Sequence, residues 1–104
     1  MAQRFKELFP PFAATLNERE FVMQLADENM SYPGQVLRQA IEKLRASPDT
    51  KALSPKEFDA MLPTMRVTES QKDFVDELAA KLNVSRAQVL RNAIFALQLS
   101  IGNK

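Results

Sequence analysis

The side chains with the clearest chemistry lie in one short segment, Thr64 to Thr68, where polar and apolar residues alternate. Successive side chains of an extended strand point to opposite sides, so Thr64, Arg66 and Thr68 share one side, opposite Met65 and Val67. If the apolar side is buried, a guanidinium and two hydroxyls face outward. Arginine can bridge O6 and N7 of a guanine and threonine can bond a base edge, but a merely solvated strand has the same pattern. The segment alone leaves both interpretations open.

The side chains most used in catalysis and metal binding are missing, because the chain has no cysteine and no histidine. Disulfides, thiolate ligands and the commonest general base are therefore excluded. Carboxylates remain, and seven of them fall on faces that we expect to be exposed helix surface: Glu18, Glu20, Asp27, Glu28, Asp73, Asp76 and Glu77. We expect a binding protein rather than an enzyme, with no cofactor, metal or small-molecule substrate.

The composition is that of an ordinary globular chain of 104 residues, 45% hydrophobic and 26% charged. No apolar run approaches the roughly 20 residues that span a bilayer, and the charged N-terminal segment does not resemble a signal peptide. We expect a cytoplasmic protein without a membrane partner. The net charge is only +1 and is divided evenly between the two halves. Bulk attraction to nucleic acid is therefore weak, and any such binding depends on where the charges lie.

The second half of the chain repeats the first at an offset of 53 residues. Residues 5–47 align without a gap to residues 58–100, and 15 of these 43 pairs are identical, against about three expected by chance. Most matched residues are apolar and helix-spaced. Each half is thus one unit that we expect to bury its apolar face against its twin.

Hydrophobic periodicity predicts two helices in each half. In the first half they cover about 18–28, capped by Asn17 with Glu20, and 33–46, with Pro33 at the favoured first position. In the second half they cover about 71–82 and 86–99, opened by capping boxes at Ser70 with Asp73 and Ser85 with Gln88. The six apolar residues that we expect in the core by spacing are Phe21, Leu25, Ile41, Phe74, Leu78 and Ile94.

A strand is expected before each helix pair. The clearer one covers 64–68, and its weaker equivalent around 11–15, restricted by prolines, needs a partner, for which 64–68 is the obvious candidate. Short prefix helices are expected over 2–8, with Phe5 and Leu8 inward, and from residue 54 to about 62. The expected organisation is one repeat over 1–47, a linker over 48–53 and a second repeat over 54–104, with one shared core.

The order strand, helix, tight turn, helix, in a unit of about 45 residues stabilised by a twin, resembles the ribbon-helix-helix family of the Arc and methionine repressors. The resemblance is clearest in the segments Thr64–Ser70 and Asn83–Ala87. It implies a mainly α fold with a short two-stranded antiparallel ribbon, formed here as a single-chain pseudo-dimer. It also implies binding of double-stranded DNA through the major groove, in a transcriptional regulator such as a repressor or in an accessory factor of DNA transfer on a mobile element. Neighbouring chains are expected to associate on DNA.

The resemblance also implies which residues contact DNA. Thr64, Arg66 and Thr68 would read bases, while in the first half the equivalent positions are Pro11, Ala13 and Thr15, of which only Thr15 can bond a base. Phosphate would be held at the start of the second helix of each repeat. The corresponding residues are Ser85 and Arg86 in one repeat and Tyr32 and Gly34 in the other, although ordinary helix capping would explain them equally well.

Two arginines at equivalent positions, Arg38 and Arg91, are more simply explained by surface ion pairs, such as Arg38 with Glu42. Two other functions also remain open. The near-neutral charge and the poor donors at Pro11 and Ala13 are compatible with a protein-interaction module that kept the fold. An antitoxin is less favoured, because only about five residues follow the last helix.

Overall fold

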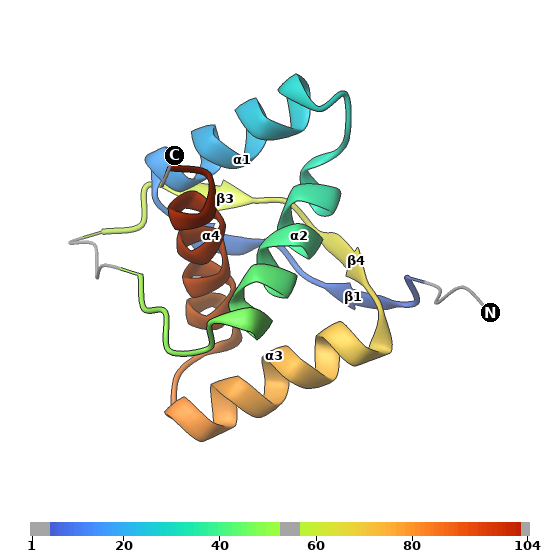
Figure 1. Ribbon diagram of the computed structural model, residues 1–104, viewed down its shortest axis with the longest axis vertical. Coiled ribbons are helices and arrows are strands. Elements are labelled where there is room, and N and C mark those ends of the chain that lie inside the picture. The colour runs from blue at the N-terminus through green and yellow to red at the C-terminus, as the bar shows by residue number, and fades with distance from the viewer. Residues whose placement is uncertain (1–4, 53–56, 103–104) are drawn as a thin grey trace.

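The computed structural model describes residues 5–52 and 57–102. In these ranges the chain is mainly helical, with two short two-stranded antiparallel sheets. The elements in chain order are β1 (Glu7–Phe9), β2 (Phe12–Ala14), α1 (Leu16–Glu28), α2 (Pro33–Ala46), β3 (Ala60–Leu62), β4 (Met65–Val67), α3 (Glu69–Leu82) and α4 (Arg86–Gly102). Figure 1 shows α2 and α4 in the middle of the molecule, crossing the strands, with α1 and α3 at opposite margins.

The four helices confirm the sequence-based prediction, with α2 at the expected bounds and the others extended by two or three residues at one end. The starts of α1 and α3 are set by threonines rather than by the expected Asn17 and Ser70. Thr15 and Thr68 are the N-caps, and each forms a capping box with the residue three positions later. Since both motifs have the preferred Glu or Gln at that position, they satisfy two backbone N–H groups at each helix start.

The strands of one repeat pair with those of the other. β1 pairs with β4 and β2 pairs with β3, both antiparallel. The expected pairing of 11–15 with 64–68 is wrong. The prolines at 10, 11 and 63 divide each extended segment into two short strands, and the strand before the prolines in one repeat pairs with the strand after them in the other. Glu7 faces Val67, and the equivalent residues in the opposite repeats, Ala60 and Ala14, also face each other. The two repeats therefore pair in the same way on both sides of the prolines.

The expected prefix helices are wrong over the residues that the structure describes. Glu7–Phe9 and Ala60–Leu62 are strands, and Leu8 and Met61 are about half exposed, whereas Phe9 and Leu62 are fully buried. This alternation has a period of two and belongs to an extended segment with one face covered. Residues 2–4 and 54–56 of these predictions lie outside the described residues.

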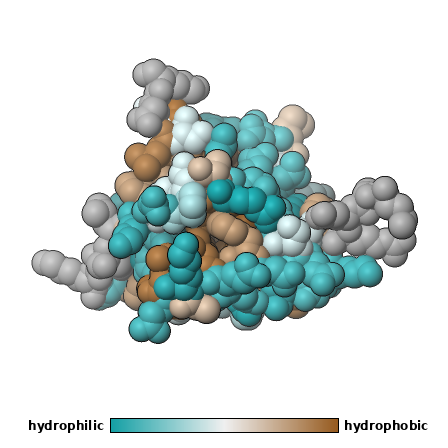
Figure 2. Space-filling view, turned by 60° about the horizontal axis from the view of Figure 1, so that its bottom comes forward, coloured by the Kyte–Doolittle hydropathy of each residue, from teal (hydrophilic) through white to brown (hydrophobic). Residues whose placement is uncertain are grey.

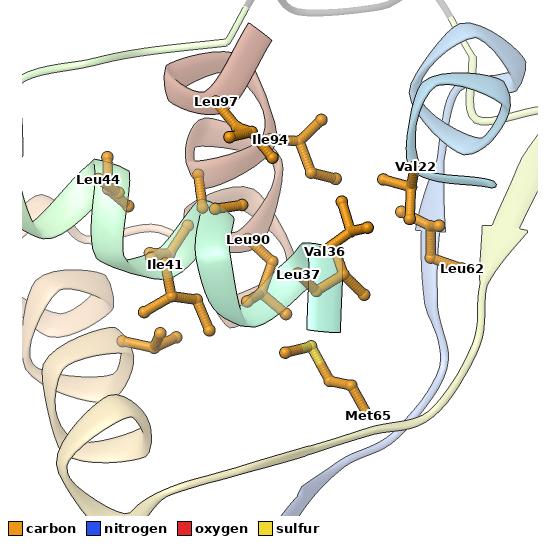
Figure 3. Close-up of a cluster of buried hydrophobic side chains, with 14 of the residues drawn as sticks. Val22, Val36, Leu37, Ile41, Leu44, Leu62, Met65, Leu90, Ile94 and Leu97 are labelled. Carbon is orange, nitrogen blue, oxygen red and sulfur yellow. The ribbon is translucent and has the colours of Figure 1, made fainter. Parts of the chain in front are cut away.

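One core is shared by both repeats. It lies mainly between α2 and α4, where Leu37, Ile41, Leu90 and Ile94 are almost fully buried (Figure 3). Leu62, Met65 and Val22 add side chains from the strands and from α1, as Figure 3 also shows. Ile41, Ile94 and Leu78 confirm the predicted core, while Phe21, Leu25 and Phe74 pack against it only partly buried.

Candidate nucleic-acid interface

Arg66 projects from the uncovered face of β4. Its neighbours Met65 and Val67 are buried and Arg66 is exposed, as the alternation predicted. Its backbone carbonyl accepts a hydrogen bond of 2.8 Å from Nη1 of Arg38 in α2. The strand is thus held to the helix by its backbone, and the Arg66 guanidinium remains free to point away from the core.

Thr64 is also exposed, directly before β4, but the two other threonines have a different role from the one predicted. Thr68 is only 6% exposed, its Oγ1 accepts from the Gln71 amide and its own amide donates to Gln71 Oε1. Thr15 makes the same pair of bonds with Glu18 and is half-buried. Both side chains cap helices, so helix capping accounts for Thr68 and Thr15 without any contact to a base. The sequence signal was the T-x-x-Q and T-x-x-E spacing.

Apolar residues complete the outer face of the paired strands. Leu8 faces Arg66 across β1 and β4, and Met61 faces Ala13 across β2 and β3. Leu8 is 51% and Met61 is 53% exposed, which is unusual for side chains of this kind. The face of the molecule shown in Figure 2 has hydrophobic areas among larger hydrophilic ones. The outward position of Leu8 and Met61 was not predicted from the sequence, because both residues were assigned to prefix helices.

The first turns of α2 and α4 adjoin the strands. A Cβ placed on Gly34, in the first turn of α2, would lie 3.9 Å from Cβ of Met65. At the start of α4, the guanidinium of Arg86 lies 4.6 Å from the ring centroid of Phe9 in β1. Two helix N-termini, each with the positive end of the helix dipole, are thus placed beside the strand pair. The amides of Gln35 and Gln88 already have capping bonds, and Pro33 has no N–H.

The four residues predicted to contact phosphate differ in their surroundings. Ser85 is exposed and its Oγ accepts from the Gln88 amide, which is ordinary capping. Tyr32 is 78% exposed and makes no side-chain cap, so its hydroxyl is accessible. Gly34 is half-buried beside Arg38.

Arg86 is fixed by a carboxylate. Its Nε lies 3.0 Å from Oδ1 of Asp76, and Lys72 lies 2.7 Å from the other oxygen of that carboxylate. Burial raises the pKa of Asp76, but the hydrogen bonds and charges of Lys72 and Arg86 outweigh this and hold the pKa below its usual value. Asp76 therefore stays ionised and orients Arg86 while reducing the net positive charge near α4.

The expectation that Glu18 lies on an exposed helix face is wrong. Glu18 accepts a 2.9 Å bond from Nε of Arg91, and the two side chains are 10% and 3% exposed. The expected Arg38–Glu42 ion pair is also absent from the described ranges, because Glu42 instead pairs with Arg45 and accepts from Gln71. The two arginines that match across the repeat thus have different partners.

Comparison with protein-family models, curated proteins and solved structures gives no match for this chain. In the part of the chain that the structure describes, no helix has the length and apolar character to cross a membrane. Residues 5–52 and 57–102 likewise contain no group of three or more acidic side chains placed to hold a metal ion. The function is therefore inferred from the geometry of the paired strands.

Proposed function

We propose that this chain is a ribbon-helix-helix pseudo-dimer that binds double-stranded DNA, with the outer face of the paired strands in the major groove. The interrepeat pairing supports this proposal, because β1 with β4 and β2 with β3 form the same arrangement twice about the central prolines. A two-stranded ribbon is one of the elements that the major groove admits. The first turns of α2 and α4 lie beside the ribbon, where helix N-termini can bind phosphates.

The observation that carries the proposal is the position of Arg66. Its guanidinium is exposed on the face opposite the core, while the Arg38 bond holds its backbone in place. A guanidinium that bridges guanine O6 and N7 discriminates against another base by about 1–3 kcal/mol. Thr64, exposed two residues earlier, adds a hydroxyl for a neighbouring base edge.

Recognition by this ribbon is unequal in its two halves. Ala13 stands at the position equivalent to Arg66, opposite the exposed Met61. Neither side chain donates a hydrogen bond, but apolar groups can contact the methyl group of thymine. The ribbon therefore reads a donor and acceptor pattern with one half and an apolar edge with the other, so that the preferred site is not a perfect palindrome.

The biological role that fits this mode of binding is occupancy of a DNA site. The chain acts as a repressor or other transcriptional regulator, or as an accessory factor that organises DNA on a mobile element, with neighbouring chains associating along the site. No covalent step is involved.

The test is selection of bound duplexes from a random pool, repeated with Arg66→Ala and with Lys43→Ala. Lys43 is exposed in the last turn of α2, so its removal changes the net charge equally without altering the ribbon. Arg66→Ala should lose about 1–3 kcal/mol, concentrated at one base pair, and Lys43→Ala should keep the selected sequence. The same selected sequence in wild type and Arg66→Ala would refute the role of Arg66.

A second function is favoured by the apolar part of the ribbon. Exposed Leu8 and Met61, together with the central prolines, suit a protein partner whose apolar surface covers this face. Titration of a labelled duplex at two salt concentrations separates the two functions. DNA binding should weaken steeply with salt, whereas absence of binding at low salt would favour the protein-interaction module.

A further inference from the structure

The internal duplication places the same arginine in two different environments. Arg38 in α2 and Arg91 in α4 are equivalent, and each guanidinium lies over the equivalent phenylalanine, at 4.1 Å from the ring centroid of Phe5 and 5.2 Å from that of Phe58. The surroundings of Arg91 can therefore serve as a template that shows which partner Arg38 lacks.

In the site around Arg91, which serves as the template, a carboxylate forms an ion pair with the arginine. Glu18, the third residue of α1, uses Oε1 to accept from the Thr15 amide at 2.8 Å and from Nε of Arg91 at 2.9 Å. Nη1 of Arg91 also donates to Gln88. The two charges are almost completely removed from water, and their pairing offsets the cost of that burial.

In the other site, the carboxylate is replaced by an amide. Gln71 is equivalent to Glu18 and makes the same capping bond through Oε1, but its Nε2 donates to Glu42 at 3.2 Å. Gln71 keeps the equivalent Oε1, but this oxygen carries no negative charge, and the N–H₂ group of Gln71 cannot accept from Arg38. Within residues 5–52 and 57–102, no carboxylate lies within ion-pair distance of Arg38.

A shallow, open cavity of about 300 Å³ lies beside Arg38 and Gln71. Its lining residues are Phe5, Gln35, Arg38, Gln39, Glu42 and Gln71. The lining includes the side-chain amides of Gln35 and Gln39, and Phe5 provides an apolar wall. Glu42, the one acidic group in the lining, is offset by Arg45 at 3.8 Å. Burial lowers the pKa of Arg38, so its cation would gain from an anion in the cavity.

We propose that this cavity binds the carboxylate of a small organic acid, which pairs with Arg38 as Glu18 pairs with Arg91. The ligand class is a short aliphatic carboxylic acid, whose charged end pairs with the guanidinium while its hydrocarbon part rests against Phe5. The site adjoins the proposed DNA-binding surface, because Arg38 also donates to the Arg66 carbonyl and lies beside Gly34 in the first turn of α2.

The experiment uses propionate, the side chain of glutamate as a free acid, added to the full chain while side-chain NMR signals of arginine and glutamine are followed. Propionate should shift the Arg38 Nε and Gln71 amide signals saturably, and chloride at the same ionic strength should not. Arg38→Gln should weaken the binding roughly tenfold or more, the value of one charge-assisted hydrogen bond.

The decisive variant is Gln71→Glu, which copies the template site. Its carboxylate should form an ion pair with Arg38 and abolish the propionate response. The denaturation midpoint of the variant shows whether it is folded. A propionate response that persists in folded Gln71→Glu, or shifts that grow linearly and equally with chloride, would overturn the proposal.

Discussion

At the scale of single residues, the difference between Glu18 and Gln71 separates the two repeats most clearly. Both residues complete a capping box, but only Glu18 also neutralises a buried arginine. The capping role could be predicted from spacing within four residues. The ion pair could not, because Arg91 lies 73 positions along the chain and only the fold brings it to Glu18.

These two residues make a matched pair of substitutions. Glu18→Ala should reduce the free energy of unfolding by about 3–5 kcal/mol, since it leaves the Arg91 guanidinium buried without its carboxylate. Gln71→Ala should cost only about 1 kcal/mol, because it removes a capping partner and the hydrogen bond to Glu42 but leaves no buried charge unpaired. Urea denaturation measures both. Equal losses in the two variants would contradict the energetic role given to the ion pair.

The carboxylate of Asp76 gives the protein a pH dependence. Because its pKa in the folded protein lies below the unfolded value of about 3.9, its contribution is complete at neutral pH and is lost as the pH falls through the lowered pKa. The side chain is 35% exposed, so solvent screening limits this contribution to under about 1 kcal/mol. Asp76→Asn should lower stability at pH 7 and flatten its fall below pH 4. A fall in stability below pH 4 that is equally steep in the wild type and in Asp76→Asn would contradict this assignment.

At the scale of elements, helices were predictable and the extent of the strands was not. The helices have apolar stripes, and their bounds depend on local caps and prolines. The strands β1 and β3 are three residues long, and their apolar residues fit a short helix equally well. Their state is decided by the partner strand in the other repeat, which local periodicity does not contain.

The true start of α3 can be tested at Thr68. Thr68→Ala should destabilise the protein by about 0.5–2 kcal/mol because it removes the side chain that accepts from the Gln71 amide. Ser70→Ala, at the N-cap expected from the sequence, lies inside the exposed first turn and should change stability by less than about 0.5 kcal/mol. A larger loss in Ser70→Ala than in Thr68→Ala would place the cap two residues later.

At the scale of the whole molecule, two unequal repeats share one core and pair their strands with one symmetric register. The duplication was visible in the sequence, and both repeats contribute to one cluster of buried residues. The sequence also identified Arg66 and Thr64 as outward residues. It did not identify the apolar half of the ribbon, because Leu8 and Met61 become neighbours of Arg66 and Ala13 only after the repeats pair.

The proposed mode of DNA binding makes the uncovered ribbon face and the adjoining helix starts the contact surface, while the outer sides of α1 and α3 face solvent. This surface joins residues from both repeats, so it exists only in the paired molecule. It is therefore a property of the whole chain rather than of either half.

The most direct test is to map a selected DNA duplex onto the backbone amide signals of the full chain by NMR titration. Saturable shifts should centre on Leu8, Ala13, Met61 and Arg66 and extend to the first turns of α2 and α4, with α1 and α3 unaffected along their exposed sides. Saturable shifts centred on the exposed sides of α1 or α3, with the ribbon unchanged, would contradict the account, as would the absence of any saturable shift.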